Sequence, residues 1–122
     1  MRVLILGGTK FLGRHLAEAA LAQGHDVTLF NRGNQSAGLY PEAEHLRGDR
    51  DGDLRALQGR TWDVALDTSG YVPRVARASA ELLGGAVEHY TFVSSISAYA
   101  HWPETPSISE ESPVGTLADL TV

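Results

Sequence analysis

Short apolar runs alternate along the chain with longer segments in which apolar residues recur every three or four positions. The runs are rich in β-branched residues and end at glycine or at polar residues, which is typical of buried strands. They predict five strands, at residues 2–6, 26–30, 44–47, 63–67 and 89–94.

The longer segments have helical periodicity. Leu12, Leu16 and Ala20 share one face of a helix predicted over 11–23, and Gly24 is suited to end it. A second helix is predicted over 73–83 and a short one over 54–57. Because strands and helices alternate, we expect a parallel sheet with right-handed crossovers and strand order 3-2-1-4-5.

A glycine-rich turn, GGTKFLG, joins the first predicted strand to the first helix. Gly7 permits a tight bend, Gly8 leaves the backbone uncrowded, and Gly13 lets the helix pack closely on the strand. Free backbone N–H groups at the helix start then favour a pyrophosphate, although such a turn can also serve chain geometry alone. The pattern predicts an α/β fold, a Rossmann-type doubly wound parallel sheet, with a dinucleotide held by Gly7, Gly8, Thr9, Lys10, Phe11, Leu12 and Gly13.

Composition narrows the possible partners. The chain has 122 residues, which fits one domain over 1–122, and its net charge of −5 disfavours nucleic acid. It has no cysteine, so disulfides and thiolate chemistry are excluded, and its histidines lack the spacing of metal ligands. The first strand follows Met1 almost at once, which leaves no room for a signal peptide, so we expect a cytoplasmic protein without a membrane partner.

Four motifs then occur in order along the chain: VLILGGTKFLGRHL from Val3, GDRDGDL from Gly48, DTSGYVP from Asp67 and YTFVSSISAY from Tyr90. This set resembles the N-terminal part of the extended short-chain dehydrogenases/reductases, in the NAD-dependent epimerase/dehydratase group. Lys10 stands where that family usually has glycine. An atypical branch of the family, with the turn GGT-x-FLG, tolerates other residues at this position. Its side chain either swings toward a phosphate or stays solvated. The resemblance implies a fold truncated before a sixth strand.

The resemblance also implies the cofactor contacts. An NAD site usually offers a carboxylate after the second strand, but no Asp or Glu lies between Leu29 and Ser36. Arg32, after Asn31, instead suits a 2′-phosphate, so we expect NADP(H), with NAD possible and an exposed arginine as the alternative.

Two further segments match cofactor-binding stations of the family. Asp49, with Arg50 beside it, takes the place of the acid that meets the adenine amino group. The segment Thr68, Ser69 and Gly70 matches the one that lines the pyrophosphate and ribose. The alternatives are an aspartate-rich solvated turn and a plain turn, respectively.

The family transfers hydride with a Ser/Thr–Tyr–Lys set. Ser95, four residues before Tyr99, matches the serine, with Ser94 and Ser97 as rivals and strand capping as the alternative. Lys10 is the only lysine of the chain, so the YxxxK pair is absent. We therefore expect the cofactor-binding portion of an NADP(H)-dependent oxidoreductase, epimerase or dehydratase acting on an unknown small molecule, inactive by itself. The alternative is a non-catalytic NADP-sensing or RNA-associated module.

If the chain is the first part of a longer enzyme, the last predicted strand loses its neighbour, and its apolar run from Tyr90 to Val93 presents an unpaired edge. Unpaired edges associate with other chains. We therefore expect a homodimer, or aggregation, through this edge of the sheet or a nearby patch.

Overall fold

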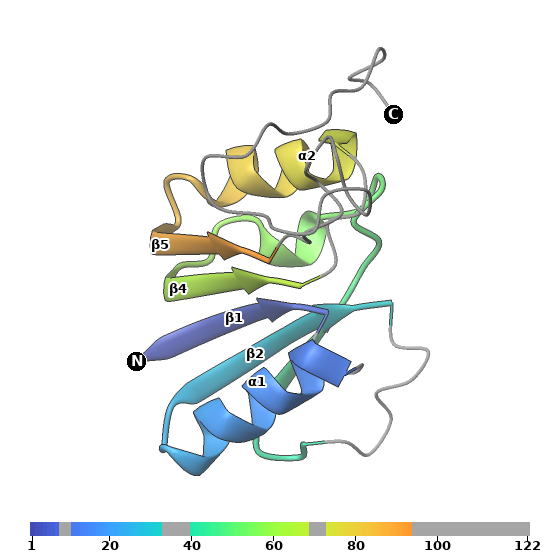
Figure 1. The fold of residues 1–122 in the computed structure, drawn as a ribbon. Helices are drawn as coiled ribbons and strands as arrows, with labels where there is room; N and C mark the ends of the chain where they lie inside the picture. The colour runs from blue at the N-terminus through green and yellow to red at the C-terminus, as the bar shows by residue number, and fades with distance from the viewer. Residues whose placement is uncertain (8–10, 33–39, 69–72, 94–122) are drawn as a thin grey trace, which may run out of the picture.

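The computed structural model of the protein describes residues 1–7, 11–32, 40–68 and 73–93. Within these ranges one five-stranded sheet has the order β3-β2-β1-β4-β5, and every pairing in it is parallel (Figure 1). The strands are β1 (Arg2–Leu6), β2 (Asp26–Asn31), β3 (Glu44–Arg47), β4 (Trp62–Asp67) and β5 (Val87–Phe92). The predicted fold class and strand order are confirmed.

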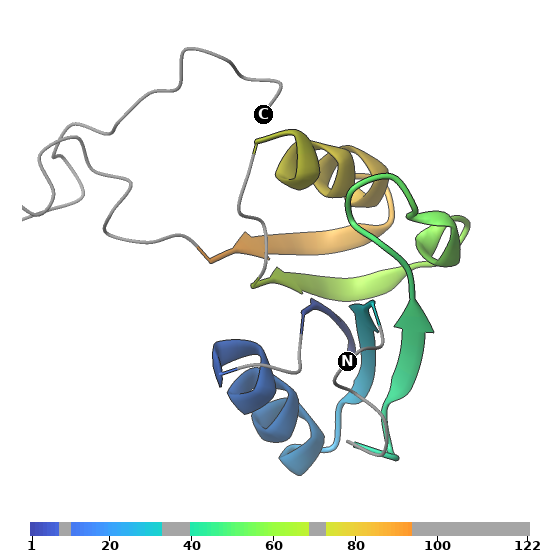
Figure 2. The same cartoon turned by 90° about the vertical axis from the view of Figure 1, so that its right-hand side faces the viewer.

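Helices cover both faces of the sheet (Figure 2). Helix α1 (Phe11–Ala22) packs on β1 and β2, where Ala17 joins Val3 and Ile5 in one buried cluster. Helix α2 (Pro73–Leu83) and the 3₁₀ turn η1 (Arg55–Leu57) cover the opposite face, where Leu57 and Leu83 pack with residues of β1, β2 and β4. The arrangement is doubly wound, as a Rossmann-type fold requires.

Burial on both faces explains why β1 has a continuous apolar sequence. Val3 and Ile5 belong to the cluster under α1, whereas Leu4 and Leu6 belong to the cluster under α2, and all four are buried. A strand that is covered on both sides has no solvent-facing position that a polar residue could occupy.

Some element boundaries differ from the sequence prediction. The fifth strand runs from Val87 to Phe92 and not from 89 to 94, because Val87 pairs with Trp62, and the Trp62 N–H donates to the Ala86 carbonyl at 2.9 Å. The short helix predicted over 54–57 is the 3₁₀ turn η1. In the described ranges neither helix combines the length and apolar character needed to cross a membrane.

Candidate functional site

All five strands end at the same edge of the sheet because they are parallel, and backbone hydrogen bonds continue just beyond those ends. Each bond joins the N–H of the residue after one strand to a carbonyl of the adjacent strand. The N–H···O pairs are Gly48–Asn31 at 3.0 Å, Gly7–Phe30 at 3.0 Å, Thr68–Leu6 at 3.1 Å and Val93–Asp67 at 2.9 Å. We call this line of residues, Gly48, Asn31, Gly7, Thr68 and Val93, the carboxyl rim.

The glycine turn leaves the centre of the carboxyl rim. Gly7 has a φ of 112°, a backbone conformation that glycine adopts without strain. The chain then enters α1 at Phe11, where Gly13 is buried in the first turns and Leu12 is 39% exposed. Gly8, Thr9, Lys10 and the side chain of Phe11 lie outside the described residues. The strand and the helix that the sequence predicted on the two sides of residues 8–10 are therefore present.

Asn31 and Arg32 occupy the end of β2. The Asn31 carbonyl accepts the Gly48 N–H, and Phe30, two residues before Arg32, accepts the Gly7 N–H. Arg32, the residue after β2, is exposed. An exposed cation therefore follows β2 at this edge of the sheet.

Asp49 belongs to a formed turn after β3. Its backbone N–H and carbonyl pair with those of Asp53 at 3.0 and 2.8 Å, and its Oδ1 accepts the Asp51 N–H at 2.9 Å. The residue itself is exposed at the rim. The turn is closed by its own backbone, while the carboxylate of Asp49 still faces solvent.

Arg50 turns away from solvent into the protein. Its guanidinium donates to both oxygens of Asp67, at 2.6 and 2.8 Å, and to Oγ of Ser79 at 2.9 Å. The Tyr90 hydroxyl also donates to Asp67, at 2.6 Å. Burial, followed by this hydrogen bond, raises the pKa of Tyr90 above its ordinary value. Asp67 and Ser79 are both fully buried.

Sequence reasoning placed Arg50 beside the cofactor and overlooked this network. One signal was available, because Asp67 ends an apolar run that reads as a buried strand. A carboxylate in such a position needs a charged or hydrogen-bonding partner.

Thr68 connects β4 to β1 across the centre of the rim. Its hydroxyl donates to the Leu6 carbonyl at 2.8 Å, and its backbone N–H donates to the same carbonyl. Ser69, Gly70 and the proposed catalytic Ser95 lie outside the described residues. In the described ranges no group of three or more His, Asp or Glu side chains could hold a metal ion.

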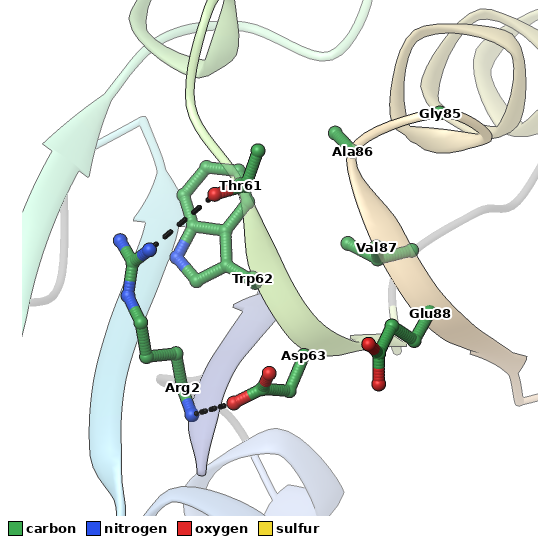
Figure 3. A pocket seen from close by; sticks show the side chains of 8 residues that line it. All are labelled: Arg2, Thr61, Trp62, Asp63, Gly85, Ala86, Val87 and Glu88. Atoms are coloured by element: carbon green, nitrogen blue, oxygen red, sulfur yellow. Dashed lines mark hydrogen bonds between the residues drawn. The ribbon is translucent and has the colours of Figure 1, made fainter.

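A hollow of about 280 Å³ lies at the opposite, amino edge of the sheet, between the starts of β1, β4 and β5 (Figure 3). Arg2 and Asp63 line it, and the Arg2 N–H donates to the Asp63 carboxylate at 2.7 Å. None of the residues that the sequence analysis selected lies in this hollow. The candidate site therefore stays at the carboxyl rim.

The chain is similar to known proteins in sequence. Residues 3–58 match the family described as NAD dependent epimerase/dehydratase. A chloroplast stem-loop binding protein of 41 kDa from Arabidopsis thaliana is 30% identical over 127 residues, which cover 91% of this chain and 33% of that protein. A 3 beta-hydroxysteroid dehydrogenase/Delta 5-->4-isomerase from Mycobacterium tuberculosis is 34% identical over 86 residues, 70% of this chain and 21% of the other.

Solved structures share the fold. A UDP-galactose 4-epimerase superposes with a TM-score of 0.78 at 22% identity, over 94% of this chain and 45% of the other. The Bordetella bronchiseptica enzyme WbmG, solved in complex with NAD, superposes with a TM-score of 0.77 at 19% identity, over 96% of this chain and 44% of the other.

The chain thus spans about a third of the first curated relative and less than half of these solved structures. Residues 3–58 of the chain therefore match the NAD dependent epimerase/dehydratase family, and the chain shares its fold with part of each of these solved structures.

Proposed function

We propose that this chain binds a nicotinamide adenine dinucleotide at the carboxyl rim, as the cofactor-binding part of an oxidoreductase, epimerase or dehydratase. The strand order carries this proposal. The chain moves outward from β1 through β2 to β3, and then outward from β1 on the other side through β4 to β5. In open α/β sheets ligands bind where the order reverses in this way. Gly7 and Thr68 lie on the two sides of that point, joined through Leu6.

The residues at the rim suit the parts of such a cofactor. Gly7 bends the chain into α1 without a side chain in the way, and backbone N–H groups at a helix start attract a pyrophosphate. The proposed phosphate segment is residues 7–13, continued by Thr68, Ser69 and Gly70. The exposed carboxylate of Asp49 can accept a hydrogen bond from the adenine amino group.

We propose NADP(H) in preference to NAD(H). Arg32 is exposed just after β2, and its planar fork matches a 2′-phosphate. Two solved structures of similar fold, a dTDP-glucose 4,6-dehydratase from Bacillus anthracis and WbmG, are described as complexes with NAD. These complexes support a nicotinamide dinucleotide, whereas the preference for the 2′-phosphate depends on Arg32 alone.

The bound cofactor would supply hydride transfer to or from a small substrate. Ser95 is proposed as the serine that hydrogen-bonds the substrate oxygen. Because the sequence contains no YxxxK pair, we propose that the chain by itself transfers no hydride. We also propose a cytoplasmic location.

An RNA-associated role is the second candidate, and similarity to the chloroplast stem-loop binding protein favours it. The net charge of −5 opposes it, because binding to a phosphate backbone needs clustered cations. Filter binding of a stem-loop RNA at increasing salt distinguishes the two functions. Tight, salt-sensitive RNA binding without dinucleotide binding would replace the proposed function.

Titration of the chain with NADPH and NADH, followed by cofactor fluorescence, tests the proposal. Saturable binding is expected, and Gly7→Ala should weaken it because a Cβ strains a φ of 112°. Gly24→Ala is the matched control, since Gly24 also has a positive φ, of 80°, but follows α1 at the other edge. Absence of saturable binding to the unaltered chain, or equal weakening by both substitutions, would overturn the proposal.

A further inference from the structure

The turn after β3 is attached to helix α2 at two points. Inside the protein, Arg50 donates to Ser79, and at the surface Arg74 donates to the Asp51 carboxylate at 3.0 Å. Ser79 and Arg74 both belong to α2 and lie five residues apart, so the attachments are about 7.5 Å apart along the helix axis. Two separated attachments fix the orientation of the turn relative to α2 as well as its distance from the helix.

The inner attachment is strong because it is charged and buried. The Arg50 side chain is only 11% exposed, and its fork binds both oxygens of the fully buried Asp67. Removal of either partner would leave a buried charge uncompensated. Arg50 therefore has a fixed position, and Asp49 is the residue directly before it in the chain.

The outer attachment reaches the Asp49 side chain itself. The Asp51 N–H donates to Oδ1 of Asp49 at 2.9 Å, and the Asp51 carboxylate is held by Arg74. The hydrogen bond from Arg74 lowers the pKa of Asp51, as expected for a charged carboxylate that is paired with a guanidinium. Arg74, Asp51 and Asp49 thus form a chain of contacts from α2 to the rim.

We propose that α2 positions the Asp49 carboxylate, through Arg50 and Arg74, to recognise the exocyclic amino group of an adenine nucleotide. The proposal rests on the dinucleotide function proposed above and adds the positioning residues. A turn that is already ordered loses less entropy when the ligand binds, so its hydrogen bond contributes more to affinity. Arg50 and Arg74 act here without touching the ligand.

The chain offers a matched control in the same turn. Arg55 pairs with Asp53 at 2.9 Å, much as Arg74 pairs with Asp51, and both arginines are exposed. Arg55→Ala and Arg74→Ala remove the same charge beside the same turn. Of these two arginines, Arg74 bonds the turn to α2 whereas Arg55 bonds to Asp53 two positions earlier in the chain, so any difference between the variants reports the connection and not the charge.

The experiment compares NADP⁺ with its hypoxanthine analogue, which lacks the adenine amino group, by calorimetric titration of the full chain. The unaltered chain is expected to prefer NADP⁺ by about tenfold, the value of one hydrogen bond to a charged group. Arg74→Ala should reduce that preference about fivefold, because it lowers the affinity for NADP⁺ and not the affinity for the analogue. Arg55→Ala should leave the preference within about twofold of its value in the unaltered chain. Arg50→Lys, which keeps the charge but loses the fork, should reduce it as well.

Each outcome decides the proposal. If Arg50→Lys fails to fold, as circular dichroism would show, Arg74→Ala gives the answer, because its surface ion pair is not needed for folding. Equal weakening of both ligands by Arg74→Ala, or an unchanged preference, overturns the positioning while the dinucleotide function stands. A wild-type chain that binds both ligands equally also overturns it. A wild-type chain that binds neither ligand overturns the proposed function as well.

Discussion

Gly48 lies directly against the ring of Phe30. A Cβ built on Gly48 would lie 2.6 Å from Cζ of Phe30 and 2.6 Å from the Asp53 carbonyl oxygen. Phe30 is 1% exposed and belongs to the core cluster under α2, so its ring has no free space to enter. The turn that carries Asp49 thus leaves the sheet at a position where only glycine fits.

Gly48→Ala should lower the free energy of unfolding by about 1 to 3 kcal/mol, the usual cost of forcing one extra carbon into a packed core. Urea unfolding at neutral pH measures the change. Gly85→Ala is the control, because a Cβ at Gly85 would meet nothing within 4 Å. Equal stability of the two variants would show that the Phe30 ring moves aside.

Tyr90→Phe should change how stability depends on pH. Burial and the hydrogen bond to Asp67 raise the pKa of Tyr90 above 10.0, so the folded state favours the neutral phenol. This contribution is fully present below about pH 10 and is lost as pH rises further, because the unfolded phenol then ionises first. The variant should be less stable by about 1 to 2 kcal/mol at pH 7.

Urea unfolding of both proteins from pH 7 to pH 11 measures this effect, and the difference in stability should narrow above about pH 10. Tyr40→Phe is the comparison. Burial also raises the pKa of Tyr40, but Tyr40 lies at the surface beside Glu18, so the narrowing should be smaller. A difference that stays constant up to pH 11 would contradict the role of the Tyr90–Asp67 bond.

The order of the strands could be predicted from the sequence because each pattern that predicts it lies within a short stretch of the chain. The apolar run 2–6, the glycine turn and the face shared by Leu12, Leu16 and Ala20 are all short-range patterns. Parallel pairing with right-handed crossovers then allows few arrangements. The start of β5 at Val87 was missed because it depends on pairing with Trp62, which lies 25 positions earlier.

The site was less predictable for the same reason. Motif positions located Asp49 and Arg50 side by side, but the two side chains have different surroundings. Asp49 is exposed, whereas Arg50 binds Asp67, which is 17 positions away and belongs to another strand. A motif gives the order of residues along the chain, and it does not show which of two neighbours turns inward.

Arg32→Ala should weaken NADP⁺ binding about tenfold or more, through loss of a charge-assisted contact to the 2′-phosphate, and should leave NAD⁺ binding within about twofold. Calorimetric titration with each cofactor measures this. Arg47→Ala is the control, since Arg47 is also exposed at the end of a strand, in register with Asn31. Equal affinity for both cofactors, unchanged by Arg32→Ala, would remove the NADP preference.

The outer edge of β5 should mediate self-association. β5 ends the sheet in the part of the chain that the structure describes, and the Val93 N–H points to Asp67 of β4. Alternate residues of a strand face opposite sides, so the N–H groups of Tyr90 and Phe92 point outward. Phe92 is also 44% exposed, which adds apolar surface to this edge.

Phe92→Lys should therefore reduce association, since a charged side chain on an edge strand opposes pairing with a second copy. Light scattering over a range of protein concentrations should show a dimer for the unaltered chain and a shift toward monomer for the variant. Leu12→Lys is the matched control, because Leu12 is 39% exposed but lies on α1, away from β5. A wild-type chain that stays monomeric at high concentration, or a dimer that Leu12→Lys weakens as much as Phe92→Lys does, would exclude the β5 edge as the interface.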